Sequence, residues 1–423
     1  MRMQQSREVL PVHLQADENT IFVGELVRYS DQIISFHFDD SYIRMSDRPV
    51  LSSSLVRRGD PAGTEDLLRT SSLLRGGRGL PPWFENLLPE GALRDFLEDG
   101  LSRERRSDFD LIKRLGGDLS GAVIVGEPVA STPAIPPLND LRFSLAGVQI
   151  KLSMLRVRDG FDMTENGIGG DTVVKLPSPK LPFLPEVEFS SMRLAAAAGV
   201  DVAYCELVPL QNLAGVPESL QEGGGFALAV DRFDRPPCGH RIHMEDFNQI
   251  LGVPADRKYA AANDETVLKI AGIFGGGEVS FLQACRRAAV NILLGNTDAH
   301  LKNWSVWYPE PSQGRLSPAY DIVAGAVYDH SDDMALRFRR TRNSSIMDTA
   351  RFERAAAFAG FASADVRAEL GSVVEKAADT WGSLLRDLPM PEDYADFLLE
   401  RAQRLALTQD FSERFITFSK AYS

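Results

Sequence analysis

The stretch Asn296-Thr-Asp-Ala-His-Leu-Lys-Asn303 is the most specific pattern in this chain of 423 residues. Within it, Asp298 and Asn303 stand five positions apart, and a second acid, Asp321, follows at some distance. An aspartate that accepts a hydroxyl proton, followed by an asparagine and an aspartate that hold Mg²⁺ against phosphates, is a spacing used in phosphoryl transfer. Because Asp-x4-Asn also arises by chance, its weight depends on residues elsewhere in the chain.

Composition and charge are those of a globular protein. Hydrophobic residues make up 44% and charged residues 25% of the chain, and its length allows one large core or two to three smaller ones. With 46 Lys and Arg against 59 Asp and Glu, the net charge of −13 argues against a chain that binds nucleic acid alone. It does not exclude a local basic patch or DNA contact through a basic partner.

The cellular compartment is predicted from three features of the sequence. Three cysteines, Cys205, Cys238 and Cys285, are too few for a disulfide framework. No apolar run approaches the roughly 20 residues of a membrane span, and the first residues lack the apolar segment of a signal peptide. We therefore expect a cytoplasmic protein that does not enter a membrane.

The first part of the chain predicts a sheet followed by helices. Short apolar runs at 21–27 and 32–38, joined by a polar turn, indicate two strands. Helical patterns follow around Leu88–Gly91 and Phe109–Ile112. Four prolines between 126 and 137 can continue neither a helix nor a central strand, so we expect a linker there.

The middle part, between residues 141 and 235, again has strand patterns. Strands are expected at 151–157, 171–176, 206–208 and 226–230. Between the second and third of these, the run Glu186–Ala198 predicts a helix that Gly199 closes as its C-cap.

From about residue 245 the pattern is almost wholly helical. Residues 281–294 have helical periodicity and end at Gly295, and residues 350–410 contain three or four amphipathic helices. A β-rich part followed by an α-rich part is the two-lobed order of protein kinases, although other α+β proteins share it.

Two segments ahead of the octapeptide fit a phosphate site. Residues 144–151, with Gly147 as their one glycine, stand where a loop over phosphates would lead into a strand, although an ordinary β-turn explains them better when they are taken alone. Lys175 lies in an apolar strand. A lysine there needs an anionic partner, such as a phosphate or Glu188, unless it points outward from an edge strand.

A third segment, residues 229–235, follows an apolar strand and precedes Pro236. Its backbone could bond a nucleotide base with Phe233 stacked on it, or it could be a charged hairpin exit. The octapeptide could likewise be a helix C-cap followed by an N-cap. Each segment alone has a simple explanation, but four of them in the kinase order over about 180 residues favour a kinase site.

Together these motifs resemble the HipA family. The resemblance covers nearly the whole chain. In the middle and last parts it lies in Ser144–Lys151, Val174–Pro177, Val230–Arg235, Thr297–Asn303 and Tyr320–Ile322. In the first part it lies in Val23–Leu26, Phe84–Gly91 and Leu115–Ala122. Ile150 occupies a position that is often polar in the family.

HipA proteins are serine/threonine kinases and the toxins of bacterial HipBA toxin–antitoxin systems. The resemblance implies that Asp298 is the catalytic base, that Asn303 and Asp321 bind Mg²⁺, and that Ser144 is autophosphorylated, which expels the ATP loop. The ATP-binding residues that it implies are Ala146, Gly147, Val148, Gln149, Ile150, Lys151, Lys175, Asp231, Arg232, Phe233, His300, Leu301, Lys302, Asn303, Tyr320 and Asp321.

The resemblance also implies partners. The antitoxin would be a HipB-like helix-turn-helix dimer, operator DNA would be bound mainly through that antitoxin, and the protein substrate would be an aminoacyl-tRNA synthetase. An acidic toxin suits docking to a basic antitoxin. The ligands expected from the resemblance are ATP and Mg²⁺.

The expected fold is α+β and bilobal, with a HipA-type N-terminal subdomain at residues 1–135, a β-rich kinase lobe at 136–236 and an all-helical lobe at 237–423. Two other functions remain open. One is a kinase-like co-repressor that binds the antitoxin without catalysis, against which the complete set Asp298, Asn303 and Asp321 argues. The other is a small-molecule kinase, against which the large N-terminal part counts mildly.

Overall fold

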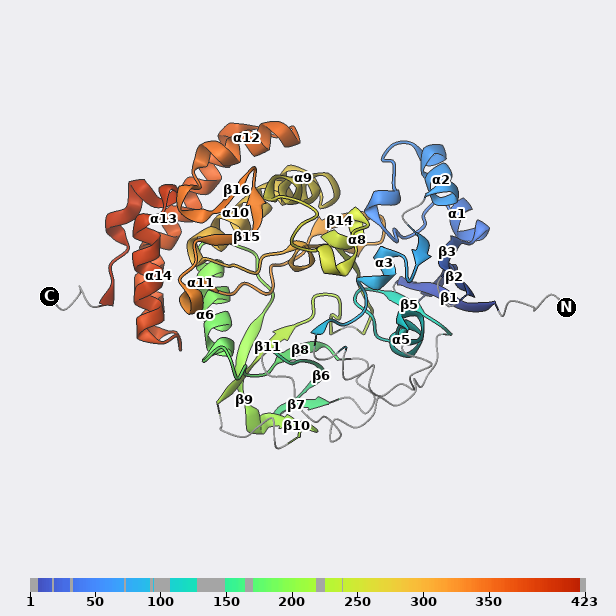
Figure 1. Ribbon diagram of the computed structural model, residues 1–423, viewed down its shortest axis with the longest axis horizontal. Coiled ribbons are helices and arrows are strands. Elements are labelled where there is room, and N and C mark those ends of the chain that lie inside the picture. The colour runs from blue at the N-terminus through green and yellow to red at the C-terminus, as the bar shows by residue number, and fades with distance from the viewer. Residues whose placement is uncertain are drawn as a thin grey trace.

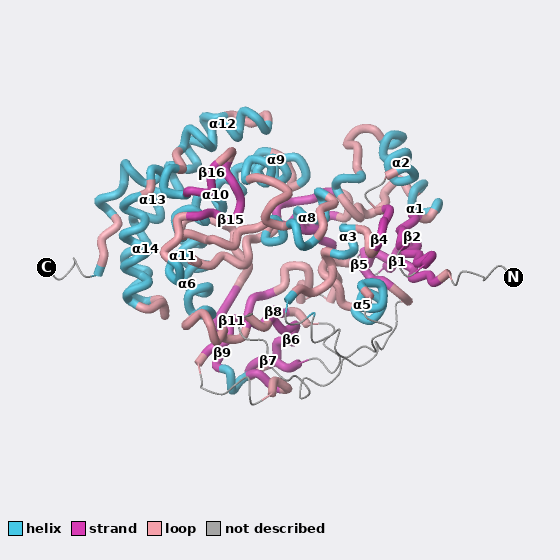
Figure 2. The backbone as a smooth tube through the Cα atoms, in the orientation of Figure 1, coloured by secondary structure: helices cyan, strands magenta, loops and turns pink. Residues whose placement is uncertain are grey.

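The computed structural model describes residues 7–16, 19–30, 33–71, 74–91, 94, 107–127, 149–163, 170–217, 225–237 and 239–418. Two larger sheets, two smaller ones and a large group of helices make up these residues. The helices between residues 326 and 404, α11 to α14, lie on the side away from the first sheet (Figures 1 and 2). Among the described residues, no helix combines the length and the apolar character needed to cross a membrane.

The first sheet is antiparallel, with the strand order β4-β3-β2-β1-β5. Its strands are β1 (Glu8–Ala16), β2 (Asn19–Ser30), β3 (Ile33–Phe38), β4 (Arg75–Arg78) and β5 (Val123–Val125). Its helices are α1 (Asp40–Arg44), α2 (Pro61–Thr70), α3 (Pro82–Glu85) and α5 (Asp108–Leu115). Trp83, Phe84 and Phe109 lie in the buried core of this unit. The two strands predicted at 21–27 and 32–38 are confirmed as parts of β2 and β3.

The helix predicted at Phe109–Ile112 is confirmed as part of α5. The helical pattern around Leu88–Gly91 is confirmed only in part, because Gly91 is helical and residues 86–90 are not. Residues 86–90 form turns and extended backbone. Pro89 has no backbone N–H to donate, and this segment contacts the helical lobe instead of continuing α3. Of the predicted linker at 126–137, residues 128–137 lie outside the described residues.

The second sheet has the order β10-β7-β6-β8-β11-β9. Its strands are β6 (Lys151–Val157), β7 (Gly160–Met163), β8 (Thr172–Lys175), β9 (Cys205–Pro209), β10 (Leu213–Ala214) and β11 (Phe226–Asp231). Helix α6 (Leu184–Ala197) packs against β9 and β11 and is followed by Gly199, at φ 93°. The four strands and the helix predicted for this part are therefore present, within one or two residues of the expected bounds.

The helical lobe surrounds the long, mostly buried helix α10 (Glu278–Leu294), which packs against α9 (Asp264–Phe274), α13 (Ser363–Asp387) and α14 (Glu392–Arg404). The remaining helices are α8 (Phe247–Leu251), α11 (Ala326–Asp329) and α12 (Thr349–Ala359). Helices α12, α13 and α14 confirm the amphipathic helices predicted for residues 350–410.

This lobe is not all-helical, which corrects the sequence-based expectation. It contains a three-stranded sheet, β12-β13-β14, and a hairpin, β15-β16. The bounds are β12 (His243–Asp246), β13 (Ser305–Glu310), β14 (Gln313–Leu316), β15 (Asp333–Phe338) and β16 (Thr341–Asn343). These strands have three to six residues each, too few for the alternation of polar and apolar residues to stand out from helical segments. The α+β, two-lobed, kinase-like fold itself is as predicted.

The three-stranded sheet joins the helical lobe to the first unit. Glu245 of β12 is completely buried and accepts hydrogen bonds from the Ser53 backbone N–H (2.7 Å), the Tyr308 hydroxyl (2.6 Å) and the Trp83 indole N–H (3.1 Å). Because a buried carboxylate is costly without donors, the two bonds from Ser53 and Trp83 specify how the two parts fit together.

Candidate active site

The octapeptide forms a loop directly after helix α10. Gly295 ends the helix with φ 65°, a left-handed conformation that favours glycine, and its carbonyl accepts the Ala326 N–H at 3.0 Å. A Cβ at this position would lie 2.5 Å from the Ala326 Cβ. The chain can therefore leave α10 toward the site only because residue 295 has no side chain.

The loop presents Asp298 to solvent. Its backbone is fixed, because its N–H donates to Asn296 Oδ1 (3.0 Å) and its carbonyl accepts from Asn303 Nδ2 (2.8 Å) and the His300 N–H (2.7 Å). Its side chain is 61% exposed. A rigid backbone with an open carboxylate is the arrangement that a general base for an incoming hydroxyl requires.

The bond from Asn303 Nδ2 to the Asp298 carbonyl also orients the Asn303 amide. Its other atom, Oδ1, receives no hydrogen bond from any described residue. Asp321 adopts φ 53°, a left-handed conformation that aspartate tolerates better than most residues. Asn303 and Asp321 thus offer an amide oxygen and a carboxylate, the hard oxygen ligands that Mg²⁺ prefers.

Two lysines converge on Asp321 from the second sheet. Lys151 Nζ lies 2.8 Å from Asp321 Oδ2, and Lys175 Nζ bonds Asp321 Oδ1. Lys175 also bonds Glu188 of α6 and is almost completely buried, whereas the Lys151 side chain is 46% exposed. The anionic partner that the sequence required for Lys175 is present as this pair of carboxylates.

Lys175 and Asp321 each stabilise the charged form of the other. Burial works against the charged form of Lys175, but Asp321 and Glu188 outweigh it and raise the lysine pKa. Burial would likewise raise the pKa of Asp321, but Lys151 and Lys175 outweigh it and lower that pKa well below its usual range. Asp321 and Lys175 are therefore charged at neutral pH, as metal and phosphate binding demand.

No group of three or more His, Cys, Asp or Glu side chains within the described ranges could form a metal site unaided. A cation held by Asn303 and Asp321 would therefore take further ligands from phosphates and water, which is how Mg²⁺ is usually bound beside a nucleotide. The residues present fit Mg²⁺ and a nucleotide, and they do not fit a self-contained metal cage.

The segment that links the two lobes lies beside the loop. The Phe233 ring is 5.9 Å from the rings of both Tyr320 and Trp307. The Tyr320 hydroxyl donates to the Lys302 carbonyl at 3.0 Å. Asp231, at the end of β11, pairs with Arg156 at 2.5 Å and keeps an exposed side chain. Phe233 and Tyr320 therefore connect the linking segment with the catalytic loop.

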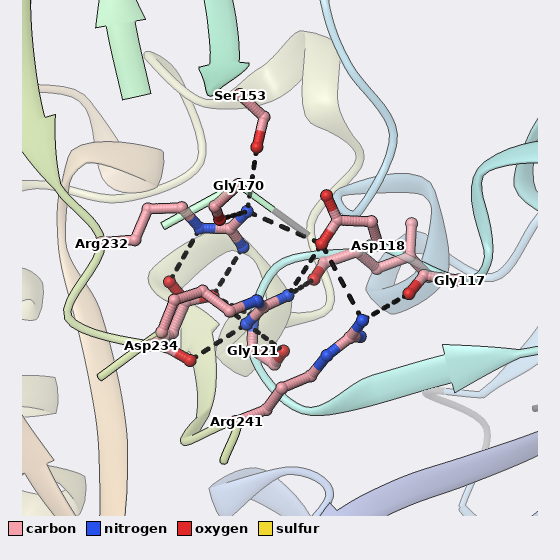
Figure 3. Close-up of polar contacts among 10 residues, drawn as sticks. Gly117, Asp118, Gly121, Ser153, Gly170, Arg232, Asp234 and Arg241 are labelled. Carbon is pink, nitrogen blue, oxygen red and sulfur yellow. Dashed lines mark hydrogen bonds and ion pairs between the residues drawn. The ribbon is translucent and has the colours of Figure 1, made fainter. Parts of the chain in front are cut away.

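Arg232 belongs to a buried ion network that joins three parts of the chain (Figure 3). Its guanidinium bonds both carboxylate oxygens of Asp234, at 3.1 and 2.9 Å, and lies 3.7 Å from Asp118 of the first unit. Arg235 bonds Asp234 (2.8 Å) and Asp118 (3.2 Å), and the Gly121 N–H donates to Asp234 at 2.8 Å. The Arg232 guanidinium thus serves the buried ion network and is not free to contact a nucleotide.

The buried carboxylate at the centre of this network is strongly perturbed. Burial alone would raise the pKa of Asp234, but the guanidiniums of Arg232 and Arg235 outweigh it and lower that pKa to about 2. The first unit supplies further acceptors, since Arg241 donates to the Gly117 carbonyl at 2.5 Å and Arg235 donates to the Leu119 carbonyl at 2.7 Å. The network therefore holds the linking segment against the first unit.

The structure describes only part of the predicted phosphate loop. Ser144, Ala146, Gly147 and Val148 fall outside the described residues. Gln149 is half-buried, and its Nε2 has no hydrogen-bond partner among described groups. Ile150 packs against the apolar core of the second sheet, and its carbonyl accepts the Leu176 N–H at 2.9 Å, which explains why an apolar residue suits this position.

Three residues of the octapeptide have side chains that are largely buried against other parts of the protein. Leu301 is completely buried in the core of the helical lobe. The Lys302 ammonium donates to the Asn86 carbonyl (2.9 Å) and pairs with Glu90 (3.0 Å), both in the first unit. Burial lowers the pKa of His300 to about 4, so this imidazole is neutral, and its Nε2 is 3.9 Å from Asp298 Oδ1, too far for a hydrogen bond. We leave the side chains of Leu301 and Lys302 out of the proposed nucleotide site.

Sequence reasoning missed Tyr259, whose hydroxyl donates to Asp298 Oδ1. It also missed Glu90 and Lys258, which form an ion pair of 2.6 Å beside it. Tyr259 lies in an irregular segment between α8 and α9 without hydrophobic periodicity, and nothing in its local sequence points to the octapeptide.

Comparison with known families places both parts of the chain. A family model described as the HipA-like C-terminal domain matches residues 143–381, which is more than half of the chain. A second model, described as the HipA N-terminal domain, matches residues 14–126.

Individual relatives agree with these matches. The protein named "Putative kinase Y4dM" from Sinorhizobium fredii is 36% identical over 405 residues, covering 92% of this chain and 96% of the relative. The serine/threonine-protein kinase toxin HipA of Shewanella oneidensis is 29% identical over 287 residues, covering 58% of this chain and 63% of the toxin. Named relatives are thus kinases, one of them a toxin.

One solved structure has the same fold over nearly the whole chain. It is the Shewanella oneidensis complex of HipA, HipB and operator DNA, with a TM-score of 0.70, 22% sequence identity and 96% coverage of both chains. At this identity the likeness is one of fold. Together with the family models and Y4dM, it leads to one conclusion: this chain belongs to the HipA family.

Proposed function

We propose that this chain is a Mg²⁺- and ATP-dependent serine/threonine protein kinase that serves as the toxin of a toxin–antitoxin pair. The observation that best supports the proposal is the convergence of Lys151 and Lys175 on Asp321. The Asp321 carbonyl accepts Asn296 Nδ2 at 3.5 Å, from the loop that also carries Asn303 and the exposed carboxylate of Asp298. A pair of lysines, two oxygen ligands and an open base are the parts that phosphoryl transfer needs.

In the proposed reaction, Asp298 accepts the proton of a serine or threonine hydroxyl on the protein substrate. As that proton moves to the carboxylate, the hydroxyl oxygen bonds to the γ-phosphorus and the bond from the γ-phosphorus to the bridging oxygen breaks, so that ADP leaves with that electron pair. Asp298 Oδ2 is suited to accept the proton, because no described residue donates a hydrogen bond to it.

The other residues bind and orient. Mg²⁺, held by Asn303 and Asp321, would neutralise charge that develops on the phosphates. Lys151, being partly exposed, can turn from Asp321 to a phosphate oxygen, whereas Lys175 stays fixed by Glu188. Asp231, the backbone of Arg232 and Phe233 would border the adenine, with Phe233 placed by its contact with Tyr320.

We propose the partners and the regulation from the family. The relative of known complex structure is bound to HipB and operator DNA, which supports a HipB-like helix-turn-helix antitoxin for this chain and contact with DNA mainly through it. An aminoacyl-tRNA synthetase is the proposed protein substrate. Autophosphorylation at Ser144 is the proposed means of self-inactivation, because a phosphate there would repel the phosphates of bound ATP.

The base assignment is tested by Asp298→Asn, which keeps the size of the side chain and removes its charge. Intact-mass spectrometry after incubation with Mg²⁺ and ATP should show one added phosphate on the wild type, mapped to Ser144, and none on the variant. Asp387→Asn, at an exposed site on α13, serves as the control and should behave as the wild type. Full phosphate transfer by Asp298→Asn would contradict the assignment.

The co-repressor alternative predicts a different result. A chain that only binds the antitoxin would neither bind ATP with Mg²⁺ in a calorimetric titration nor add phosphate to any protein. A small-molecule kinase would bind ATP and release ADP with metabolites but label no protein. Titration, ADP release and protein labelling together separate the three functions.

A further inference from the structure

The two oxygens of the Asp298 carboxylate have different surroundings. Oδ1 accepts the hydroxyl of Tyr259 and is also the oxygen nearest His300, while Oδ2 receives nothing from any described residue. A carboxylate in which one oxygen accepts a hydrogen bond and the other does not has a defined orientation. Oδ2 is therefore the oxygen left open to a substrate hydroxyl.

Tyr259 is held in position by its neighbours. Its ring meets the His300 ring edge-on, with centroids 4.9 Å apart and planes at 89°. The Lys258 ammonium lies 5.6 Å from the Tyr259 ring centroid, and the Lys258 carbonyl accepts the Leu301 N–H at 3.3 Å. The tyrosine therefore moves together with the loop whose base it contacts.

Glu90 of the first unit contacts both this segment and the octapeptide. Glu90 bonds Lys258 with one oxygen (2.6 Å) and Lys302 with the other (3.0 Å), so a single carboxylate holds both sides of the loop. Burial would raise the pKa of Glu90, but Lys302 and Lys258 outweigh it and lower that pKa, which keeps the bridge ionised at neutral pH. The ion pairs of Glu90 with Lys258 and Lys302 connect it to both segments beside the base.

We propose that Tyr259 is a positioning residue for the catalytic base, and that Glu90 of the N-terminal domain sets the place of Tyr259 through Lys258. The inference rests on the proposed kinase function, which it deepens. The Tyr259 hydroxyl aligns Asp298 so that Oδ2 accepts the substrate proton. The hydroxyl keeps its own proton throughout, because burial, together with Asp298, raises the pKa of Tyr259.

The tyrosine is tested by Tyr259→Phe, which removes only the hydroxyl. ADP release with Mg²⁺ and ATP should show kcat lowered about tenfold with the KM for ATP unchanged, since the loss of one aligned hydrogen bond affects the transition state and not nucleotide binding. Tyr29→Phe is the matched control, because Tyr29 has the same 38% exposure and also makes one side-chain hydrogen bond, to His37, in the N-terminal domain. It should leave kcat unchanged.

Two results would overturn the role of Tyr259. An unchanged kcat would mean that its hydroxyl does not align the base. A raised kcat would mean that the hydroxyl covers the base and competes with substrate. If the wild type neither binds ATP nor releases ADP, the proposed function itself has failed, which is a different outcome from a wild-type rate in the variant.

The role of Glu90 is tested by Glu90→Gln, with Glu25→Gln as control, because Glu25 forms an exposed ion pair with Arg7 in the same domain. Glu90→Gln should lower kcat about three- to tenfold with the KM for ATP unchanged. If Glu90 acts through Tyr259, the double variant with Tyr259→Phe should be no slower than Tyr259→Phe alone. Multiplied effects in the double variant would overturn this part of the proposal.

Discussion

At the scale of single residues, Lys175 is part of a buried ion cluster that also belongs to the proposed active site. Its ammonium has two carboxylate partners, Glu188 and Asp321, and almost no contact with solvent. Removing one partner of a buried ion pair destabilises a fold more than replacing both partners by apolar residues, because the remaining charge is left without compensation. The lysine therefore contributes to the fold and to the site at the same time.

We predict that the two contributions of Lys175 can be separated by a second substitution. Lys175→Met should abolish phosphate transfer and lower the free energy of unfolding by about 3–5 kcal/mol, because Glu188 and Asp321 then face each other across the buried site. Adding Glu188→Gln should restore part of that stability but none of the activity. Urea denaturation and protein labelling with ATP would measure both.

Lys376→Met, at an exposed site on α13, is the control for loss of a lysine and should change neither quantity. If the double variant were less stable than Lys175→Met, the ionised carboxylate of Glu188 would not be the source of the destabilisation.

At the scale of elements, the site depends on where helix α10 stops. The helix ends in a left-handed glycine against Ala326 and Arg401, and the next residues form the octapeptide loop that holds the proposed base. A small change in this turn would move Asp298 and Asn303 together, because they are bonded to each other through the loop backbone.

We therefore predict a large effect of Gly295→Ala. The left-handed backbone costs an alanine about 1 kcal/mol, and the close approach to Ala326 adds to this, so we expect a loss of at least about 2 kcal/mol and no phosphate transfer. Gly360→Ala is the matched control, since Gly360 also follows a helix with positive φ but has nothing within 4 Å of the added carbon. It should cost about 1 kcal/mol and keep activity, as measured by thermal unfolding and ADP release.

Equal effects of Gly295→Ala and Gly360→Ala on stability and activity would contradict this explanation. The destabilisation would then come from the backbone conformation alone, and the contact with Ala326 would have no special part in placing the loop.

Much of this arrangement could be predicted from sequence because it is local. Helix α10, its end at Gly295 and the strand that contains Lys175 follow from periodicity and C-cap chemistry, and the motif order led to the correct fold class. Strand β12 was missed because it pairs with β13, about 60 positions later, and no local pattern encodes such pairing. The hairpin of β13 and β14 is local, but its strands are too short for their alternation to stand out. Tyr259 and Glu90 were missed for the same reason, since only the tertiary fold brings them to the loop.

At the scale of the whole molecule, buried polar groups join the first unit to the rest of the described chain. Glu245 receives donors from the first unit, and the network of Asp118, Asp234 and three arginines connects that unit to the segment between the lobes. Such contacts are specific, because any other packing would leave buried charges without partners.

This network predicts an acid-sensitive contribution to stability. Asp234 has a pKa of about 2 in the folded chain against an ordinary value of 3.8, so it stabilises the fold above about pH 4, by about 2 kcal/mol, and that contribution is lost as the pH falls toward 2. The difference in unfolding free energy between the wild type and Asp234→Asn should be constant between pH 5 and 7. It should be about 1 kcal/mol smaller at pH 3, as measured by urea denaturation.

Asp333→Asn, at an exposed site on β15, is the control and should show no such pH dependence relative to the wild type. A difference for Asp234→Asn that stays constant down to pH 3 would mean that Asp234 is not ionised more readily in the folded chain than in the unfolded chain.

The ion network also constrains how a gene for such a protein can change. Asp118 lies before the segment 128–148 and Arg235 lies after it, so a recombination event inside that segment would separate the codons of a buried ion pair. A foreign N-terminal domain without an acid at the equivalent position would leave Arg235 and Arg241 with one carboxylate fewer. The two domains of this chain would therefore have to be exchanged together, or not at all.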